Sequence, residues 1–248
     1  MGYEFIFSRI KRIKMERIRT LQNHHVFSGF NLELLPPIEK KLFDEAGQII
    51  RYKKNEFVYE EGSRLKGVYL ILKGMAKMSQ TNSEGTEQIL FFIAAGELFG
   101  YRALLGDMNH TRSVKCLENC EIKFIDSNTF LKLLDSSKTL TRMLLKQVCH
   151  EFTLLANQNL IYAQKGIRER MAFALLVLNE KFKLPNSITE VSNIRITRTN
   201  LAAFIGTSID VVSRNIKYFS KLKIIRTHGK SIFIIDFDYL LKVTGVPY

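Results

Sequence analysis

The stretch ITRTNLAAFIGTSIDVVSRNIKYF, residues 196–219, has the pattern of two short helices joined by a tight turn. Thr197 is a suitable N-cap for a first helix that runs through Ile205, and Gly206 provides the left-handed residue with which helices often end. Ser208 is in position to cap the helix that follows. The segment is therefore predicted to be a helix-turn-helix, a unit whose second helix enters the major groove of DNA.

The second of these helices is expected to have one buried and one exposed face. Val212, Ile216 and Phe219 recur at helical spacing and are predicted to face the core. The opposite face has the candidate base-contacting side chains, which are Ile209, Asp210, Ser213, Arg214 and Lys217. Arg214 is the first choice, because arginine can make a bidentate contact with N7 and O6 of guanine. Asp210 has two compatible interpretations: it accepts from a cytosine amine, or it is a favourable anion at the helix N-terminus that pairs with Arg214 one turn later.

A β-hairpin is predicted after the second helix. Residues 222–225 and 231–235 are rich in apolar side chains, and the turn 227–230 between them contains glycine and polar residues. In this hairpin His228 and Lys230 are expected to lie close to DNA phosphate, and a turn exposed only to water is the alternative. The C-terminal region is thus predicted to be a winged helix-turn-helix.

Residues 49–125 have a different pattern, with short alternating segments such as 67–72 and 88–93. Glycines between these segments indicate tight turns; they are Gly62, Gly74, Gly85, Gly96, Gly100 and Gly106. A closed antiparallel barrel or roll is the expected product, because rolling a sheet up removes its exposed edges. No parallel strand-helix-strand pattern competes with it. The fold class is therefore predicted to be α+β, with an N-terminal antiparallel β-roll or jelly roll.

A long helix is predicted for residues 139–163, where apolar side chains recur near a 3.5-residue period. The predicted contact residues of this dimerisation helix are Leu144, Val148, Phe152, Leu155, Asn159 and Tyr162. A helix packed only on its own domain is the alternative. A homodimeric coiled coil is favoured, because the apolar stripe extends to Met143 and Ala156 with no second helix nearby to cover it. Gly166 then marks a hinge, and residues 167–182 are predicted to form another helix.

The composition fits an intracellular protein with a partner rich in phosphate. The chain of 248 residues is long enough for two domains. Its 37 Lys and Arg residues against 24 Asp and Glu give a formal net charge of +13, which fits nucleic acid although basic enzymes exist. The 3 cysteines are too few and too irregularly spaced for a disulfide framework or a zinc site, so a reducing cytoplasm is expected. No apolar run approaches the length of a membrane span, and no signal peptide is recognisable.

Residues 1–24 form a basic amphipathic segment. The segment is interpreted as an arm that packs on the first domain, or as sequence upstream of a true start at Met15, rather than as a helix for membrane or DNA. The expected organisation of the chain is a basic N-terminal arm at 1–24, a β-roll sensor domain at 25–138, a dimerisation helix at 139–165 and a winged helix-turn-helix DNA-binding domain at 166–248.

Motifs in the C-terminal region resemble the DNA-binding domain of the Crp/Fnr superfamily; these are 196–198, Leu201, 205–208, 212–214, Lys217 and 228–230. In the same order along the chain, further motifs resemble that superfamily's cyclic-nucleotide-binding-type β-roll, namely 57–62, 69–74, 96–100 and 112–113. The resemblance covers residues 27–237. It implies a transcription regulator that binds a pseudo-palindromic site in double-stranded DNA as a homodimer, with half-sites about one helical turn apart, and that has RNA polymerase as a further partner.

The resemblance also implies roles for single residues. Basic side chains match phosphate-contacting positions, and with two flanking threonines they give the predicted phosphate set: Thr197, Arg198, Thr199, His228 and Lys230. Asp210, Ser213 and Arg214 match base-reading positions. Their spacing is closer to the Fnr branch, which has glutamate where this chain has Asp210, so the exact half-site sequence stays open.

In the members that respond to cyclic AMP, the effector pocket lies in the β-roll, and the matching positions here are Gly100, Tyr101, Arg112, Ser113, Leu155 and Ala156. Arg112 and Ser113 retain the pair that binds the cyclic phosphate, although Arg112 is alternatively structural and paired with Glu97 or Asp107. Tyr101 replaces the glutamate that binds ribose, and the two long-helix positions are apolar where adenine needs hydroxyl groups. Cyclic AMP is therefore disfavoured, and the effector is unidentified.

Other cofactors and functions are also disfavoured. An Fnr-type iron-sulfur cluster needs clustered N-terminal cysteines, and none precedes Cys116. Haem needs a convincing axial ligand, and His110 is no better a candidate than any other loop histidine. No Walker loop, dinucleotide fingerprint, nucleophile elbow or metal-spaced set of His and Glu is found, so an enzyme is not expected. The alternative function is a cyclic-nucleotide-binding regulatory module without a DNA-binding role, and the helix-turn-helix argues against it.

Overall fold

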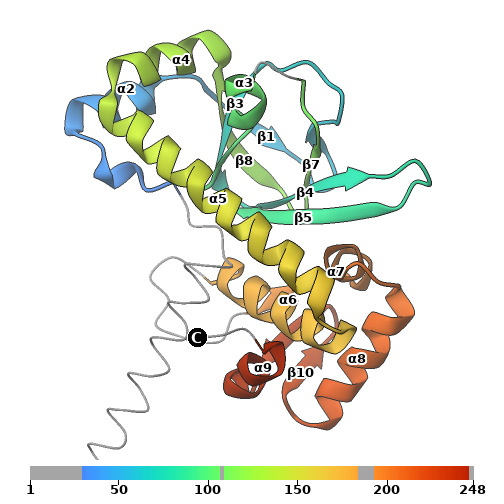
Figure 1. Cartoon of the computed structure of the whole chain (residues 1–248). Helices are drawn as coiled ribbons and strands as arrows, with labels where there is room; N and C mark the ends of the chain where they lie inside the picture. The colour runs from blue at the N-terminus through green and yellow to red at the C-terminus, as the bar shows by residue number, and fades with distance from the viewer. Residues whose placement is uncertain (1–29, 107–108, 184–192, 246–248) are drawn as a thin grey trace, which may run out of the picture. The chain divides into compact units, whose positions relative to one another are not determined.

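The computed structural model (Figure 1) describes residues 30–106, 109–183 and 193–245. These residues form two compact units, one that ends at Cys149 and one that begins at His150. The boundary lies inside the long helix α5, Lys138–Gln164, whose extent agrees with the helix predicted for 139–163. None of the helices in the described ranges combines the length and hydrophobicity that crossing a bilayer requires. The predicted arm at 1–24 lies outside the described residues.

The first unit contains two four-stranded sheets. One has the order β1-β8-β3-β6, with the bounds Gln48–Tyr52, Cys120–Asp126, Gly67–Lys73 and Leu98–Phe99. The other has the order β2-β7-β4-β5, with the bounds Phe57–Tyr59, Ser113–Cys116, Met75–Thr81 and Glu87–Ala94. All pairings among these described strands are antiparallel, which confirms the predicted antiparallel β-roll.

A glycine at the turn between β3 and β4 allows close approach of the backbone. Gly74 has a φ of +96°, and a Cβ atom there would lie 2.7 Å from the carbonyl oxygen of Asn119 and 2.7 Å from Sγ of Cys120. A side chain at this position would therefore displace the backbone of the neighbouring turn, and the left-handed φ adds to the strain. This is why the sequence has glycine at the end of β3.

The alternation of side chains along β3 separates two cores. Val68 and Leu70 belong to a core that the sheet shares with helices. Tyr69 and Ile71 point to the other core, which lies between the two sheets. The helices on the first side are η1, α2, α3, α4 and the beginning of α5, with the bounds Leu32–Leu34, Pro37–Glu45, Tyr101–Leu105 and Ser127–Ser136 for the first four.

The second unit is built around α6, Ile167–Lys181. Every residue from Met171 to Asn179 is buried, so the helix is covered on all sides, by α7, α8 and α9 among others. These three helices have the bounds Arg198–Ile205, Ile209–Lys221 and Phe237–Thr244. A three-stranded sheet of order β10-β11-β9 completes the unit, with the bounds Ile225–His228, Ser231–Ile234 and Ile194–Arg195.

Helices α4 and α9 were not among the predicted elements, although each begins with an aspartate cap. Asp126 Oδ1 accepts a hydrogen bond from Thr129 N at 3.1 Å, and Asp236 Oδ1 accepts one from Tyr239 N at 2.8 Å. An aspartate directly before an apolar periodic run is a recognised start signal for a helix. That signal is present in the sequence for both helices.

Candidate nucleic-acid interface

The helix-turn-helix has the capping geometry that its sequence predicts. Thr197 Oγ1 accepts a hydrogen bond from Asn200 N at 3.1 Å, and Ser208 Oγ accepts one from Val211 N at 3.4 Å. Gly206 ends α7 in the left-handed conformation, with φ 75° and ψ 54°. The two caps satisfy amide groups that a helix N-terminus leaves without an intrahelical partner. Together with the glycine they fix the residue at which α8 begins.

Helix α8 presents an apolar face to the core and a polar face to solvent. Val212, Ile216 and Phe219 are buried, as predicted. Of the predicted base-contacting residues, Ser213 is half-buried. The other four are exposed, namely Ile209, Asp210, Arg214 and Lys217. In the described structure Asp210 and Arg214 form no ion pair with each other, so the pairing considered from sequence is not made.

Arg198 connects the predicted phosphate-contacting residues to the predicted base-contacting residues. Its Nη1 donates a hydrogen bond to Ser213 Oγ at 3.3 Å. Arg198 and its neighbour Thr199 are exposed in the first turn of α7. The first turn of α7 and the outer face of α8 therefore adjoin. A hydroxyl oxygen that accepts from Arg198 still has its own proton to donate, so Ser213 is able to donate to an acceptor on a base.

The wing sheet has one buried and one cationic face. The strand register pairs Arg226 with Phe233, His228 with Ser231, and Ser231 with Arg195. Directly paired residues lie on the same side of a sheet, and residues two apart along a strand do as well. These five residues therefore share the face opposite to the buried isoleucines of β9 and β11, and all three of the basic ones are exposed.

Arg195 and Arg226 were not among the predicted phosphate-contacting residues. The spacing of Arg226 and His228 along one strand, two residues apart, is a signal that they share a face. Arg195 gives no such signal, because it joins the wing only through pairing of β9 with β11. Lys230 and Gly229 lie in the exposed turn between β10 and β11, and Gly229 has a φ of 58°. The turn is thus placed as predicted.

Helix α5 has an exposed apolar stripe, formed by Leu145, Val148, Phe152 and Leu160. The side chains of Leu145 and Phe152 are 63% and 75% exposed, which is unusual for residues of this size and hydrophobicity. Of the predicted contact residues, Val148, Phe152 and Asn159 are exposed, and Leu155 is half-buried. A large part of the predicted contact face is therefore directed to solvent.

Two of the predicted contact residues on α5 lie away from the exposed stripe. Leu144 is only 3% exposed and belongs to the core of the first unit, where it packs with Phe130 and Leu140. Its neighbour Leu145 is the one that lies on the exposed stripe, and a dimer contact of Leu144 stays a prediction. Tyr162 is half-buried because its hydroxyl donates a hydrogen bond to the carbonyl oxygen of Phe204 at the end of α7. Tyr162 therefore contacts its own helix-turn-helix, and its contact with a partner helix stays a prediction.

The predicted effector residues fall into both units. The first unit has Gly100, Tyr101, Arg112 and Ser113, and the second has Leu155 and Ala156. Tyr101 is 1% exposed and is part of the core between β3 and the helices, so its ring has a structural role. Ser113 Oγ accepts a hydrogen bond from Glu61 N at 2.9 Å. The grouping of the six residues into one pocket stays a prediction.

Several aromatic rings pack in the core between the two sheets of the first unit. The ring centroid of Tyr69 lies 5.3 Å from that of Phe99 and 5.2 Å from that of Phe124. His110 stacks on Tyr59 with 3.7 Å between ring centroids. Burial raises the pKa of Tyr69 to about 12 and lowers the pKa of His110 below its ordinary value. Both rings are therefore neutral near pH 7. No group of three potential metal ligands occurs among the described residues.

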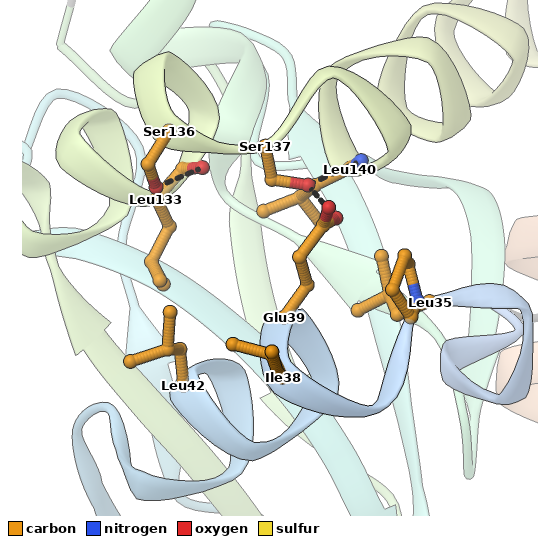
Figure 2. A pocket seen from close by; sticks show the side chains of 9 residues that line it. Leu35, Ile38, Glu39, Leu42, Leu133, Ser136, Ser137 and Leu140 are labelled. Atoms are coloured by element: carbon orange, nitrogen blue, oxygen red, sulfur yellow. Dashed lines mark hydrogen bonds between the residues drawn. The ribbon is translucent and has the colours of Figure 1, made fainter.

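A cavity of about 330 Å³ lies between α2 and the junction of α4 with α5 (Figure 2). Its wall is mostly apolar and consists of Leu35, Pro36, Ile38, Glu39, Leu42, Leu133, Ser136, Ser137 and Leu140. The hydroxyl of Ser137 donates a hydrogen bond to the Glu39 carboxylate, and its oxygen accepts one from Leu140 N at 2.9 Å. The polar groups at this end of the cavity are therefore already engaged with one another. None of the predicted effector residues lines it.

Two family models match the chain in the order of the two units. Residues 49–137 match the model of the cyclic nucleotide-binding domain, and residues 169–243 match the model of the Crp-like helix-turn-helix domain. The chain belongs to the Crp/Fnr family of DNA-binding transcription regulators. The second match contains α7, α8 and the wing, so these elements belong to the helix-turn-helix domain of this Crp/Fnr regulator.

The Crp/Fnr regulator is similar to the fumarate and nitrate reduction regulatory proteins of Vibrio cholerae and Escherichia coli K12. It is 26% identical to the first over 207 residues and 26% identical to the second over 209 residues, with 82% of each chain covered in both alignments. Among solved structures, FixK2 from Bradyrhizobium japonicum has a TM-score of 0.74 at 18% identity, over 82% of this chain and 100% of that one. At this identity the likeness shows a common fold.

Proposed function

We propose that this Crp/Fnr regulator is a cytoplasmic homodimer that binds a pseudo-palindromic DNA site through α8, acts together with RNA polymerase and has no catalytic activity. The observation that supports the proposal is the outer face of α8, where Asp210, Arg214 and Lys217 are exposed next to a capped helix start. The N-terminal residues of such a helix meet base edges in the major groove. In this proposal each part of the chain has its own role. The sensor domain is residues 25–138, the dimerisation helix is 139–165 and the DNA-binding domain is 166–248. The arm at 1–24 has none of these roles.

Base contacts and phosphate contacts are assigned to different parts of the second unit. Arg214 makes the bidentate contact with guanine, with the other predicted residues of α8 beside it. The first turn of α7 and the wing contact phosphate, through the predicted set and through Arg195 and Arg226 on the same face as His228. The hydrogen bond from Arg198 to Ser213 then holds a phosphate-contacting side chain next to a base-contacting one.

The dimer interface is assigned to the exposed apolar stripe of α5. Leu145, Val148 and Phe152 follow one another at steps of three and four residues, which is the spacing of a coiled-coil contact face. In a two-fold symmetric pair, each helix covers the stripe of the other with an identical stripe. Leu160 extends the stripe toward the end of the helix.

The sensor domain is proposed to respond to an effector other than cyclic AMP. Tyr101 is held in the core, and Leu155 and Ala156 have no side-chain hydrogen-bonding groups for adenine. An iron-sulfur cluster and haem remain disfavoured, because no cysteine precedes Cys116 and no histidine stands out as an axial ligand. The effector itself stays unidentified.

Selection from a randomised library of DNA duplexes tests the proposal. We expect the full-length protein to enrich a motif with two inverted half-sites whose centres are about 10 base pairs apart. We also expect the logarithm of affinity to fall linearly with the logarithm of salt concentration, because phosphate contacts release counterions. A pool without an enriched motif, or an affinity that salt does not change, would contradict the proposal.

A further inference from the structure

Two side chains from outside the helix-turn-helix donate hydrogen bonds to the carboxyl end of α7. The hydroxyl of Tyr162, on α5, donates to the carbonyl oxygen of Phe204. Arg170 Nη1, on α6, donates to the carbonyl oxygen of Ile205 at 3.3 Å. Gln158 Nε2 in turn donates to the Tyr162 hydroxyl oxygen at 3.0 Å. All of these residues belong to the second unit, so the contacts lie within one compact body.

The end of a helix is where such donors have the largest effect. The last four carbonyl groups of a helix have no intrahelical N–H to pair with, and the helix dipole is negative there. At α7, the amides of Gly206 and Thr207 both donate to Ala202 O, at 2.9 and 3.1 Å. Phe204 and Ile205 lie closer to the end and are buried. The tyrosine and the arginine guanidinium therefore act as side-chain caps on this end.

The environment keeps the Tyr162 hydroxyl protonated and in place. Burial raises the pKa of Tyr162 above its ordinary value, so the group is a neutral donor at physiological pH. The Arg170 guanidinium lies 5.9 Å from the centroid of the Tyr162 ring, which places the two caps side by side. Gly166 N donates to Glu169 Oε2 at 2.6 Å and thereby fixes the first turn of α6, which contains Arg170.

The capped end of α7 leads directly into the turn before α8. Gly206 follows α7, and Ser208 caps α8. Tyr162 thus connects the end of α7 with the end of α5, the helix whose exposed stripe is assigned to the dimer, and Arg170 connects it with the beginning of α6, which follows α5 directly. We propose that Tyr162 and Arg170 are positioning residues that set the orientation of α8 relative to α5, and with it the separation of the two recognition helices in the dimer. This inference rests on the proposed dimeric DNA-binding function.

A series of duplexes with altered half-site separation tests the inference. Each duplex contains the pseudo-palindrome selected by the wild-type protein, with the separation changed by one or two base pairs, and each base pair shifts a half-site by about 3.4 Å along the axis. For Tyr162→Phe we expect affinity at the optimal separation to fall about two- to tenfold, the range of one lost hydrogen bond. Affinity at the altered separations should stay the same or rise. The separation profile, which is affinity plotted against half-site separation, should therefore become flatter. Affinity for a single half-site should not change.

Tyr239→Phe is the matched control, because it removes an exposed tyrosine hydroxyl from α9 in the same unit. It should retain the wild-type separation profile. Arg170→Met, which keeps the aliphatic stem but no donor, should flatten the profile, and Arg170→Lys should restore part of it because an ammonium group can still donate to Ile205 O. Melting temperatures of all variants are measured in parallel.

The outcomes separate this inference from the function on which it rests. A wild-type protein that selects no paired half-sites overturns both. A wild-type protein with a clear optimum and a Tyr162→Phe variant with the same profile overturns the inference alone. An equal loss of affinity on all duplexes, the single half-site included, together with a lower melting temperature, indicates a merely stabilising contact and also overturns it.

Discussion

Single side chains on the outer face of α8 are expected to decide which base pairs this regulator prefers. Arg214 is exposed and is not held by an ion pair with Asp210, so its guanidinium is free to adopt the bidentate geometry that guanine requires. Lys230 lies in the exposed turn of the wing, where a point charge fits phosphate. Removal of Arg214 should therefore reduce the preference for one DNA sequence over another, whereas removal of Lys230 should weaken binding to all sequences alike.

Arg214→Ala is expected to reduce the preference for the selected site over random duplex by about 1–3 kcal/mol, because a bidentate base contact is lost. Competition binding at fixed salt measures this preference. Lys230→Ala serves as the control: it should weaken both duplexes alike and make the salt slope shallower by about one. If Arg214→Ala weakens selected and random duplexes equally, Arg214 does not read a base.

At the scale of elements, α5 has two apolar stripes with different tasks. Leu144 is packed into the core of the first unit, whereas Leu145 is exposed one residue later. A helix turns by about 100° per residue, so neighbouring positions point in clearly different directions. One stripe therefore stabilises the fold of the first unit, and the other is available for the second copy of the chain.

Phe152→Glu is expected to disrupt the dimer, because it places like charges opposite each other across the two-fold axis. Sedimentation at micromolar concentration measures the effect. Ile38→Glu is a matched control, since Ile38 on α2 is 76% exposed and Phe152 is 75% exposed. A Phe152→Glu protein that remains dimeric would place the interface elsewhere.

Leu144→Ala is expected to lower the free energy of unfolding by about 2–5 kcal/mol, because it leaves a cavity in a well-packed core. Leu145→Ala should change the stability of the monomer by far less, since its side chain is 63% exposed. Chemical denaturation at concentrations low enough to favour monomer compares the two. Equal losses would show that the two stripes are not distinct.

At the scale of the whole molecule, α5 begins in one unit and ends in the other. An effector that acts on the first unit can influence the second unit through this helix, provided that it binds two states with different affinity. The chemistry of the sensor domain limits what that effector is. Tyr69, Phe99 and Phe124 pack among aliphatic side chains between its two sheets, and Tyr101 is held in its other core.

Cyclic AMP is expected neither to bind at micromolar concentration nor to raise affinity for the selected site. Polar groups of ribose and adenine that are buried without hydrogen-bond partners cost about 1–3 kcal/mol each. Arg112 and Ser113 match only the residues that bind the cyclic phosphate, so they offer no partner for these groups. Titration calorimetry and operator binding with and without the nucleotide measure both points. Tight binding that also increases operator affinity would contradict the prediction and imply that other groups supply the missing contacts.

The sequence by itself determined the features that depend on neighbours within a few residues. The caps Thr197 and Ser208, the left-handed Gly206 and the glycine turns of the β-roll all follow from short stretches of sequence, because capping and turn formation are local. Periodicity also predicts the buried stripe of α8 and the extent of α5. For α9, the cap at Asp236 is a start signal of the same local kind, although the helix was not among the predicted elements.

The tertiary structure decided what depends on segments distant in the sequence. Leu144 and Leu145 are both leucines on one helix, and only packing against β3 and α4 selects which of them is buried. The spacing of Tyr162 fits an apolar stripe. Its hydroxyl nevertheless donates a hydrogen bond to the end of α7, 42 residues further along the chain. Arg195 joins the cationic face of the wing through strand pairing alone. Periodicity predicts that a helix has a buried face, but tertiary contacts determine which segment packs against that face.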